Sequence, residues 1–209
     1  MSKPGVDQIS CLPQHALRYC RKLLCVLLAA LVSCKAASPD RTQHDAPVKT
    51  YERFVEGAAA PQFVLKDAQQ REVRLSDYAN RVVLLNFWAT WCVPCVQEMP
   101  ALQRLSDKLR PRGFEVLSIN VNDLTEKKAA MDFVKRNGFT FPVLYDDERS
   151  AAASYGIGEL PASFIILRRG VFGALSDPRT GVKSVGITAE REWDSPAVAK
   201  EIGALVALE

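Results

Sequence analysis

The pattern of apolar and polar positions predicts strands that alternate with helices from about residue 60 onward. Two short alternating runs, 63–66 and 72–75, flank the polar stretch 67–70 and predict a β-hairpin. Residues 82–88 form a nearly continuous apolar run of β-forming residues, which is typical of a strand buried on both faces. Further apolar runs predict strands over 114–121, 141–145, 162–167 and 183–186.

Helical periodicity occupies the stretches between these strands. Gly138 closes one predicted helix, and Ser195 is a suitable N-cap for the last one. Because strands alternate with helices, the chain is predicted to have an α/β fold. The longer connection over 168–187 has no function that the sequence indicates. Helices are predicted from the cysteine pair at 92 and 95 to about residue 110, and over 126–137, 150–155 and 195–208.

A basic flank and a short apolar run near the N-terminus are typical of a secretory signal. Arg21-Lys22 precedes the apolar run 23–33, which is shorter than the roughly 20 residues that a membrane-spanning helix needs. The run ends in Leu31-Val32-Ser33-Cys34, which resembles the bacterial lipobox, whose cysteine is lipidated. We therefore expect a lipoprotein signal peptide over 1–33 and a lipid anchor on Cys34. An ordinary signal peptide cleaved nearby is the alternative.

The rest of the chain divides into a tether and a domain. Residues 34–58 are polar and interrupted by proline, so we expect a tether there and a folded domain over 59–209. The formal net charge of +3 lies entirely within 1–33, where four basic residues accompany one acid. The domain therefore lacks the cationic excess that draws proteins to phosphate backbones, and nucleic acid is excluded as a partner.

Cysteine usage indicates chemistry rather than structural cross-linking. Three of the six cysteines lie within 1–33, and Cys34 is the predicted lipid attachment site. Only Cys92 and Cys95 then remain as thiols in an oxidising compartment. Two cysteines this close together enclose too small a loop to stabilise a fold, so the pair is predicted to react.

The sequence Cys92-Val93-Pro94-Cys95 follows a buried strand and begins a helix. The N-terminus of a helix carries partial positive charge and free N–H groups, which stabilise a thiolate on Cys92. One helical turn brings the two sulfurs within bonding distance, with Cys95 the more buried. Pro94 stands where a missing N–H costs little, and it stiffens the turn. This stiffness favours the dithiol form, and hence a reductant.

These features predict thiol–disulfide exchange. The Cys92 thiolate attacks a disulfide of a client protein, and Cys95 then attacks the sulfur of Cys92 to release the client. Half of a zinc site is the alternative, but tetrahedral zinc needs two more ligands and the mature chain offers only His44. We expect no metal and no cofactor apart from the redox-active pair itself.

Several motifs lie around the pair: Ala60-Pro61-Gln62-Phe63, Leu75-Ser76-Asp77-Tyr78, the stretch 86–95, Glu98-Met99-Pro100, Gly156-Ile157-Gly158-Glu159-Leu160-Pro161 and Arg191-Glu192-Trp193-Asp194-Ser195-Pro196. These motifs resemble the TlpA/ResA branch of membrane-anchored thioredoxin-like proteins. This resemblance implies a thioredoxin-like fold with a central mixed β-sheet flanked by helices and an N-terminal β-hairpin. It also implies a location in the bacterial periplasm or cell envelope.

The resemblance also implies partners. Members of this branch reduce disulfides in client proteins, which include apocytochromes c before haem attachment and proteins that assemble the copper centre of cytochrome oxidase. We therefore expect disulfide-bearing client proteins and a membrane dithiol donor that recharges the pair. Contact with the membrane is expected through the lipid anchor.

Substrate-binding residues are implied by the same match. The loop that ends in Leu160-Pro161 corresponds to the family's cis-proline loop, whose backbone pairs with the extended substrate chain. The alternative is that Pro161 is an ordinary trans turn proline. Trp91 is expected to cover the Cys92 sulfur and touch substrate beside Pro94, whereas Trp88 is expected to pack in the core.

Glu98 lies one helical turn beyond Cys95, and the family match favours a role as general acid or base for that thiol. The alternative is a surface glutamate stabilised by the helix dipole. Thioredoxins carry a buried aspartate on the strand before the motif, and the matching position here is Asn86. Because asparagine does not titrate, this proton-transfer role either moves to Glu98 or is lost.

Three other functions compete with disulfide reduction. A thiol peroxidase-like antioxidant protein is one, although the C-x-x-C pair and the adjacent Trp91 favour exchange with disulfides. A copper-delivery protein needs a wider cysteine spacing and a distant histidine, and no histidine follows His44. A non-catalytic interaction module would have no use for an intact reactive pair.

Overall fold

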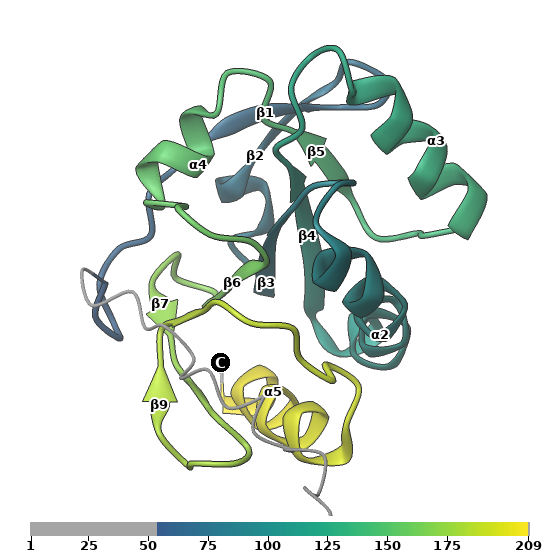
Figure 1. The fold of residues 1–209 in the computed structure, drawn as a ribbon. Coiled ribbons are helices and arrows are strands. Elements are labelled where there is room, and N and C mark those ends of the chain that lie inside the picture. The colour runs from purple at the N-terminus through teal and green to yellow at the C-terminus, as the bar shows by residue number, and fades with distance from the viewer. Residues whose placement is uncertain (1–53, 209) are drawn as a thin grey trace, which may run out of the picture. The chain divides into compact units, whose positions relative to one another are not determined.

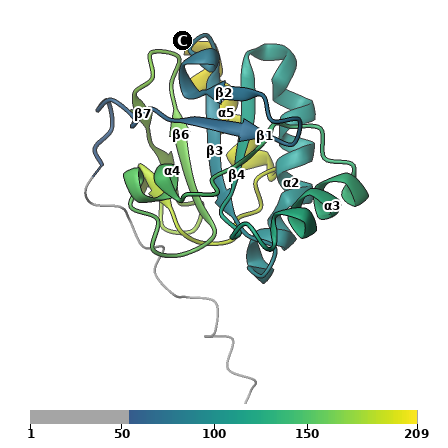
Figure 2. The same ribbon diagram turned by 90° about the horizontal axis from the view of Figure 1, so that it is seen from above.

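The computed structural model describes residues 54–208, whose ribbon is drawn in two orientations in Figures 1 and 2. The predicted signal peptide over 1–33, the lipid attachment at Cys34 and the tether residues 34–53 lie outside the described residues. Within the described part of the chain, no helix combines the length and the apolar character needed to cross a lipid bilayer.

A mixed β-sheet forms the centre of the described fold. Its order is β10-β6-β3-β4-β5-β1-β2, with β7 paired to β6, and β8 and β9 form a separate two-stranded sheet. The two central strands β3 and β4 are parallel, whereas β3 and β6 are antiparallel. The strands are β1 (Val64–Asp67), β2 (Glu72–Arg74), β3 (Val82–Trp88), β4 (Phe114–Asn120), β5 (Val143–Tyr145), β6 (Ala162–Ile166), β7 (Phe172–Gly173), β8 (Leu175–Ser176), β9 (Lys183–Ser184) and β10 (Gly186–Ile187).

Helices cover both faces of this sheet (Figure 1). Asn86, on one face of β3, bonds to Glu98 of α2 (Val93–Leu109), and Trp193, just before α5 (Pro196–Leu208), also bonds to Glu98. Phe87, on the opposite face, contacts Tyr155 at the end of α4 (Ser150–Ser154), with ring centroids 5.4 Å apart. The remaining helical elements are α3 (Lys127–Asn137) and the 3-10 turns η2 (Leu75–Tyr78) and η3 (Arg110–Arg112).

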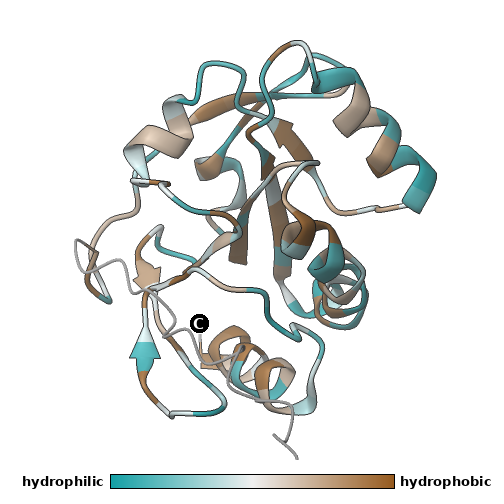
Figure 3. Cartoon of the chain, in the orientation of Figure 1, coloured by the Kyte–Doolittle hydropathy of each residue, from teal (hydrophilic) through white to brown (hydrophobic). Residues whose placement is uncertain are grey.

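The core lies around β3 and β4, in which every residue is buried. Figure 3 shows hydrophobic residues concentrated in these central strands. Two buried central strands need cover on both faces, which explains why their sequences are almost continuously apolar rather than alternating. The predicted α/β fold, the hairpin formed by β1 and β2, and the predicted strand over 82–88 are therefore confirmed.

The folded part of the chain begins earlier than the predicted boundary at residue 59. The Phe54 ring packs 4.7 Å from the Phe172 ring. The backbone N–H of Gly57 donates to the Phe172 carbonyl at 2.8 Å, and the Phe172 N–H donates to the Ala58 carbonyl at 2.8 Å. Residues 54–58, which were assigned to the tether, therefore belong to the folded part of the chain. The Phe54 ring contact and the backbone hydrogen bonds of Gly57 and Ala58 hold them against β7.

The connection over 168–187 differs from the prediction of a single strand at 183–186. Its two-residue strands β7 and β8 were not predicted, and β9 and β10 belong to different sheets on either side of Val185. Strands of two residues are too short to show an alternating pattern, so periodicity does not detect them.

Candidate active site

The cysteine pair lies where the chain leaves β3 and enters α2. Cys92 is the N-cap of α2, and its Sγ accepts a hydrogen bond from the Cys95 backbone N–H at 3.3 Å. Pro94 stands in the first turn, where its missing N–H removes no intrahelical bond. Cys92 and Cys95 form a disulfide in this structure. The predicted strand–turn–helix setting of the pair is therefore present.

The disulfide is covered more completely than the sequence indicated. Cys92 is 6 % exposed and Cys95 is 1 % exposed, so Cys95 is the more buried cysteine, as predicted. Trp91 and Val93, on either side of Cys92, are 60 % and 64 % exposed. Trp88 is fully buried, in agreement with its predicted place in the core. Cys92 is therefore the more accessible of the two sulfur-bearing residues, and exposed apolar side chains flank it.

Electrostatics at this helix terminus favour a thiolate once the disulfide is reduced. The first turn of α2 contains no acidic residue, so no side-chain carboxylate there offsets the positive end of the helix dipole. The Cys95 backbone N–H already donates to the Cys92 Sγ, and in the dithiol form the same donor stabilises negative charge on that sulfur.

The peptide bond between Leu160 and Pro161 is cis, as predicted. Pro161 precedes β6, and Ala162 pairs with Phe87 near the end of β3. The start of β6 therefore lies at the same end of the sheet as residues 89–92, which connect β3 to α2 and are called the cysteine loop here. Pro161 is buried and Leu160 is half-buried. The structure thus brings the predicted substrate-binding loop, which ends in Leu160-Pro161, to the same end of the sheet as the cysteines.

Glu98 is buried, at 2 % exposure, and hydrogen-bonded through both carboxyl oxygens. Asn86 Nδ2 donates to Oε1 at 2.8 Å. Trp193 Nε1 donates to Oε2 at 3.0 Å, and the Arg191 backbone N–H donates to the same oxygen at 3.3 Å. The alternative of an exposed surface glutamate is therefore wrong. Among the hydrogen bonds of residues 54–208, none joins Glu98 to either cysteine.

Burial raises the pKa of Glu98 to about 8, although the hydrogen bonds from Trp193, Asn86 and Arg191 act in the opposite direction. A carboxyl group with this pKa exchanges its proton near neutral pH. Glu98 also lines a surface cleft of about 440 Å³ between α2 and residues 190–196, which brings solvent close to the group. Glu98 is thus a buried carboxyl group one helical turn beyond Cys95, with a raised pKa.

Several residues that support the site were not predicted. Trp193 was noted only as part of the segment before the last helix, yet it bonds to Glu98 across 95 positions of sequence. Arg191 lies over the Trp193 ring at 5.5 Å and donates from Nη2 to the Ser176 carbonyl at 2.8 Å. Asn122 bonds to Thr90 in the cysteine loop. No local pattern in the sequence marks such long-range contacts.

Metal ligands do not gather at this site. Within the described residues, no group of three or more histidine, cysteine, aspartate or glutamate side chains is arranged to hold a metal ion. His44 lies outside those residues. That the redox-active pair works without a metal or cofactor stays a prediction.

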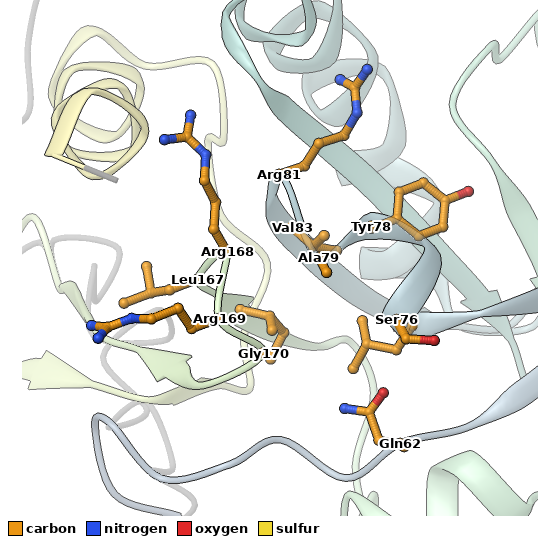
Figure 4. A pocket seen from close by; sticks show the side chains of 12 residues that line it. Gln62, Ser76, Tyr78, Ala79, Arg81, Val83, Leu167, Arg168, Arg169 and Gly170 are labelled. Atoms are coloured by element: carbon orange, nitrogen blue, oxygen red, sulfur yellow. The ribbon is translucent and has the colours of Figure 1, made fainter.

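A cavity of about 210 Å³ lies at the opposite end of β3, between η2 and the turn that follows β6 (Figure 4). Arg81 Nη1 donates to the carbonyls of Arg110 and Phe114, both at 3.3 Å. Arg168 Nη2 donates to the Val206 carbonyl at 3.1 Å. The guanidinium groups of Arg81 and Arg168 point away from the cavity in Figure 4.

Solved structures share this fold. A protein from Chlorobium tepidum assigned as a thiol:disulfide interchange protein DsbE is 31 % identical, with a TM-score of 0.60, and the match covers 73 % of this chain and 99 % of that one. A secreted thiol-disulfide isomerase from Corynebacterium glutamicum is 29 % identical, with a TM-score of 0.56 and coverage of 70 % and 84 %. Fold and site together define a thioredoxin-like protein with a vicinal cysteine pair.

Residues 57–173 match the AhpC/TSA family, and the chain belongs to this family. It is 42 % identical to the thiol-disulfide oxidoreductase ResA of Geobacillus thermodenitrificans over 54 % of this chain and 64 % of that protein. It is 32 % identical to ResA of Bacillus thuringiensis subsp. konkukian over 71 % and 84 %. The first of these matches thus spans less than two thirds of the relative. The resemblance to the TlpA/ResA branch is confirmed.

Proposed function

We propose that this chain is a protein thiol–disulfide oxidoreductase that reduces disulfides of client proteins through Cys92 and Cys95. The observation that carries the proposal is the disulfide at the N-terminus of α2, with Cys92 as the N-cap and Cys95 one turn further into the core. The similarity to proteins named ResA supports the same activity.

The reaction proceeds in two exchange steps from the dithiol form. The Cys92 thiolate attacks one sulfur of the client disulfide, which forms a mixed disulfide and releases the first client thiolate. Cys95 loses its proton and attacks the Cys92 sulfur, which closes the Cys92–Cys95 bond and releases the second client thiolate. The client gains two electrons and the chain loses two. A dithiol donor must then reduce the Cys92–Cys95 bond again.

The surrounding residues have separate roles in this proposal. Glu98 accepts the proton of Cys95 and returns it, because its raised pKa lies in the working range of a general base. Leu160 and Pro161 present backbone to the client chain beside the cysteines. Trp91 offers an exposed apolar surface to the client, and Pro94 shapes the turn that holds both sulfurs.

We further propose the setting in which this chemistry takes place. The chain is anchored to the bacterial cell envelope through lipidated Cys34, and a membrane dithiol donor recharges it. Its clients are proteins of cytochrome c maturation or of copper-centre assembly in cytochrome oxidase. The lipobox-like sequence before Cys34 and the similarity to the TlpA/ResA branch support this placement.

Trapping with Cys95→Ser tests the function and identifies the clients. Without the Cys95 thiol the second step stops, so mixed disulfides through Cys92 should accumulate in cells that make the full chain. Cys92→Ser/Cys95→Ser is the matched control and should trap nothing. If the single variant forms no mixed disulfides either, the proposed function is wrong. A reduction potential near about −120 mV, that of a strong oxidant, would contradict the reducing direction.

A further inference from the structure

The loop after β4 holds the cysteine loop through one buried side chain, Asn122. Because β3 and β4 are parallel with Trp88 opposite Asn120, Thr90 and Asn122 each stand two residues beyond the last pair. Asn122 Oδ1 accepts a hydrogen bond from the Thr90 backbone N–H at 3.0 Å. Asn122 Nδ2 donates to Thr90 Oγ1 at 2.7 Å. One amide group therefore binds both the backbone and the side chain of Thr90.

The Asn122 amide is itself fixed by two further contacts. Its Oδ1 also accepts from Asn120 Nδ2 at 2.7 Å, and its Nδ2 also donates to Glu126 Oε2 at 2.7 Å. Asn122 is only 3 % exposed, so water does not compete effectively for these bonds. Breaking them leaves buried polar atoms without partners, which is costly. The side chain is thus held in one orientation.

Thr90 lies in the four-residue connection 89–92 between β3 and α2. The only turn bond within this connection that joins its ends runs from the Cys92 N–H to the Ala89 carbonyl, at 3.2 Å. We propose that Asn122 is a positioning residue, which fixes Thr90 and thereby holds the Cys92 sulfur within bonding distance of Cys95. This inference rests on the proposed function. It adds Asn122 to the residues of that function, as one that acts on Cys92 indirectly, through residues 89–92.

Loss of this contact has a definite physical consequence. In the dithiol form no covalent bond restrains Cys92, and without Asn122 the connection 89–92 adopts more conformations. Closing the disulfide then costs more conformational entropy. The equilibrium should therefore shift toward the dithiol, and attack by the Cys92 thiolate should slow.

The test compares Asn122→Ala with the wild-type full chain in two measurements. Amide hydrogen exchange at Thr90 should accelerate about tenfold or more, because its acceptor is lost. In glutathione buffers the dithiol–disulfide equilibrium constant should shift about tenfold toward the dithiol, which equals about 30 mV for a two-electron couple. Thr125→Val is the matched control, because Thr125 Oγ1 bonds to Asp123 in the same loop and does not contact Thr90. It should change neither value.

Thr90→Val keeps the proposal testable if Asn122→Ala fails to fold. This variant loses only the hydroxyl contact, and about a threefold shift is expected, while Thr90→Ser should retain wild-type values because it keeps the hydroxyl. Wild-type values in Asn122→Ala, or in Thr90→Val if the former does not fold, would overturn the positioning role. If the wild-type chain exchanges with no disulfide, the proposed function fails, whereas Thr90 amide exchange still tests the contact.

Discussion

The two ends of the central sheet each bury one glutamate, and the two carboxyl groups have different partners. At the cysteine end, Glu98 accepts hydrogen bonds from uncharged donors of Asn86, Trp193 and the Arg191 backbone. At the opposite end, Glu115 is 3 % exposed and forms an ion pair with Arg110 at 3.3 Å. Within the described residues, Glu115 Oε1 has no hydrogen-bond partner.

This difference in partners gives the two carboxyl groups different expected roles: proton exchange for Glu98 and a structural ion pair for Glu115. Burial raises the pKa of both carboxyl groups, but Arg110 and Arg81 lower the pKa of Glu115 and so limit the increase. Within the described residues, no side-chain cation forms a hydrogen bond with Glu98, and burial raises its pKa to about 8. A buried carboxyl group surrounded by neutral donors is therefore suited to proton exchange, and one beside arginines is suited to an ion pair.

The largest effect is expected from Cys92→Ser. Without the attacking thiolate, reduction of a protein disulfide should fall by a factor on the order of 10³ or more, with the fold retained. The measurement is turnover of an insulin-type disulfide substrate at pH 7. Arg110→Ala, at the other end of the sheet, is the matched control and should keep wild-type turnover. Equal losses in both variants would show that the two ends are not functionally distinct.

Glu98→Gln is expected to slow exchange by about 10²-fold, because glutamine neither accepts nor returns a proton. The pH–rate profile should also lose a step near the Glu98 pKa of about 8. Glu115→Gln serves as the comparison and should leave the rate and profile unchanged. An unchanged rate in Glu98→Gln would remove this residue from the mechanism.

The pH dependence of stability should also distinguish the two carboxyl groups. Because the pKa of Glu98 is higher in the folded chain than its ordinary 4.5, the folded state binds this proton more tightly than the unfolded state. Its stabilising contribution is therefore complete below pH 4.5 and is lost as pH rises through 8, by about 1.4 kcal/mol per pH unit. Urea unfolding at several pH values should show a steeper decline toward pH 8 in the wild type than in Glu98→Gln, in which Glu115, whose pKa is also raised, still contributes. An equally steep decline in the variant would assign the titration to another group.

The smallest effect is expected from Arg110→Ala. Removal of the guanidinium leaves Glu115 buried without its ionic partner, so the free energy of unfolding should fall by about 1–2 kcal/mol. The Arg110 side chain is 43 % exposed, and solvent screening reduces the effect. Urea unfolding at pH 7 measures it. A wild-type midpoint would mean that the ion pair contributes nothing at this end.

Much of the fold could be predicted because its signals are local. The apolar run 82–88 marks β3 directly, and helical periodicity after Cys92 marks α2. The two-residue strands β7 and β8 could not be predicted, since they are held by long-range pairing and not by their own sequence. Phe54 was assigned to the tether because its packing partners, such as Phe172, are distant in sequence.

The residues of the candidate site also fall into those that local sequence could predict and those that depend on long-range contacts. Cys92, Cys95 and Pro161 stand in short motifs whose context is local, so their places were predictable. The burial of Glu98 was not, because it depends on Trp193, which lies 95 positions further along the chain, just before α5. Asn122 was missed for a similar reason: its contact with Thr90 follows from strand register, which no single segment reveals.

The most direct test of the central claim is a redox titration of the purified chain, with alkylation and mass measurement of the peptide that contains Cys92 and Cys95. The account predicts that both thiols appear and disappear together in one reversible two-electron step, and that the reduced chain opens a protein disulfide. A pair that stays oxidised in every dithiol buffer, or a dithiol form that opens no protein disulfide, would contradict it.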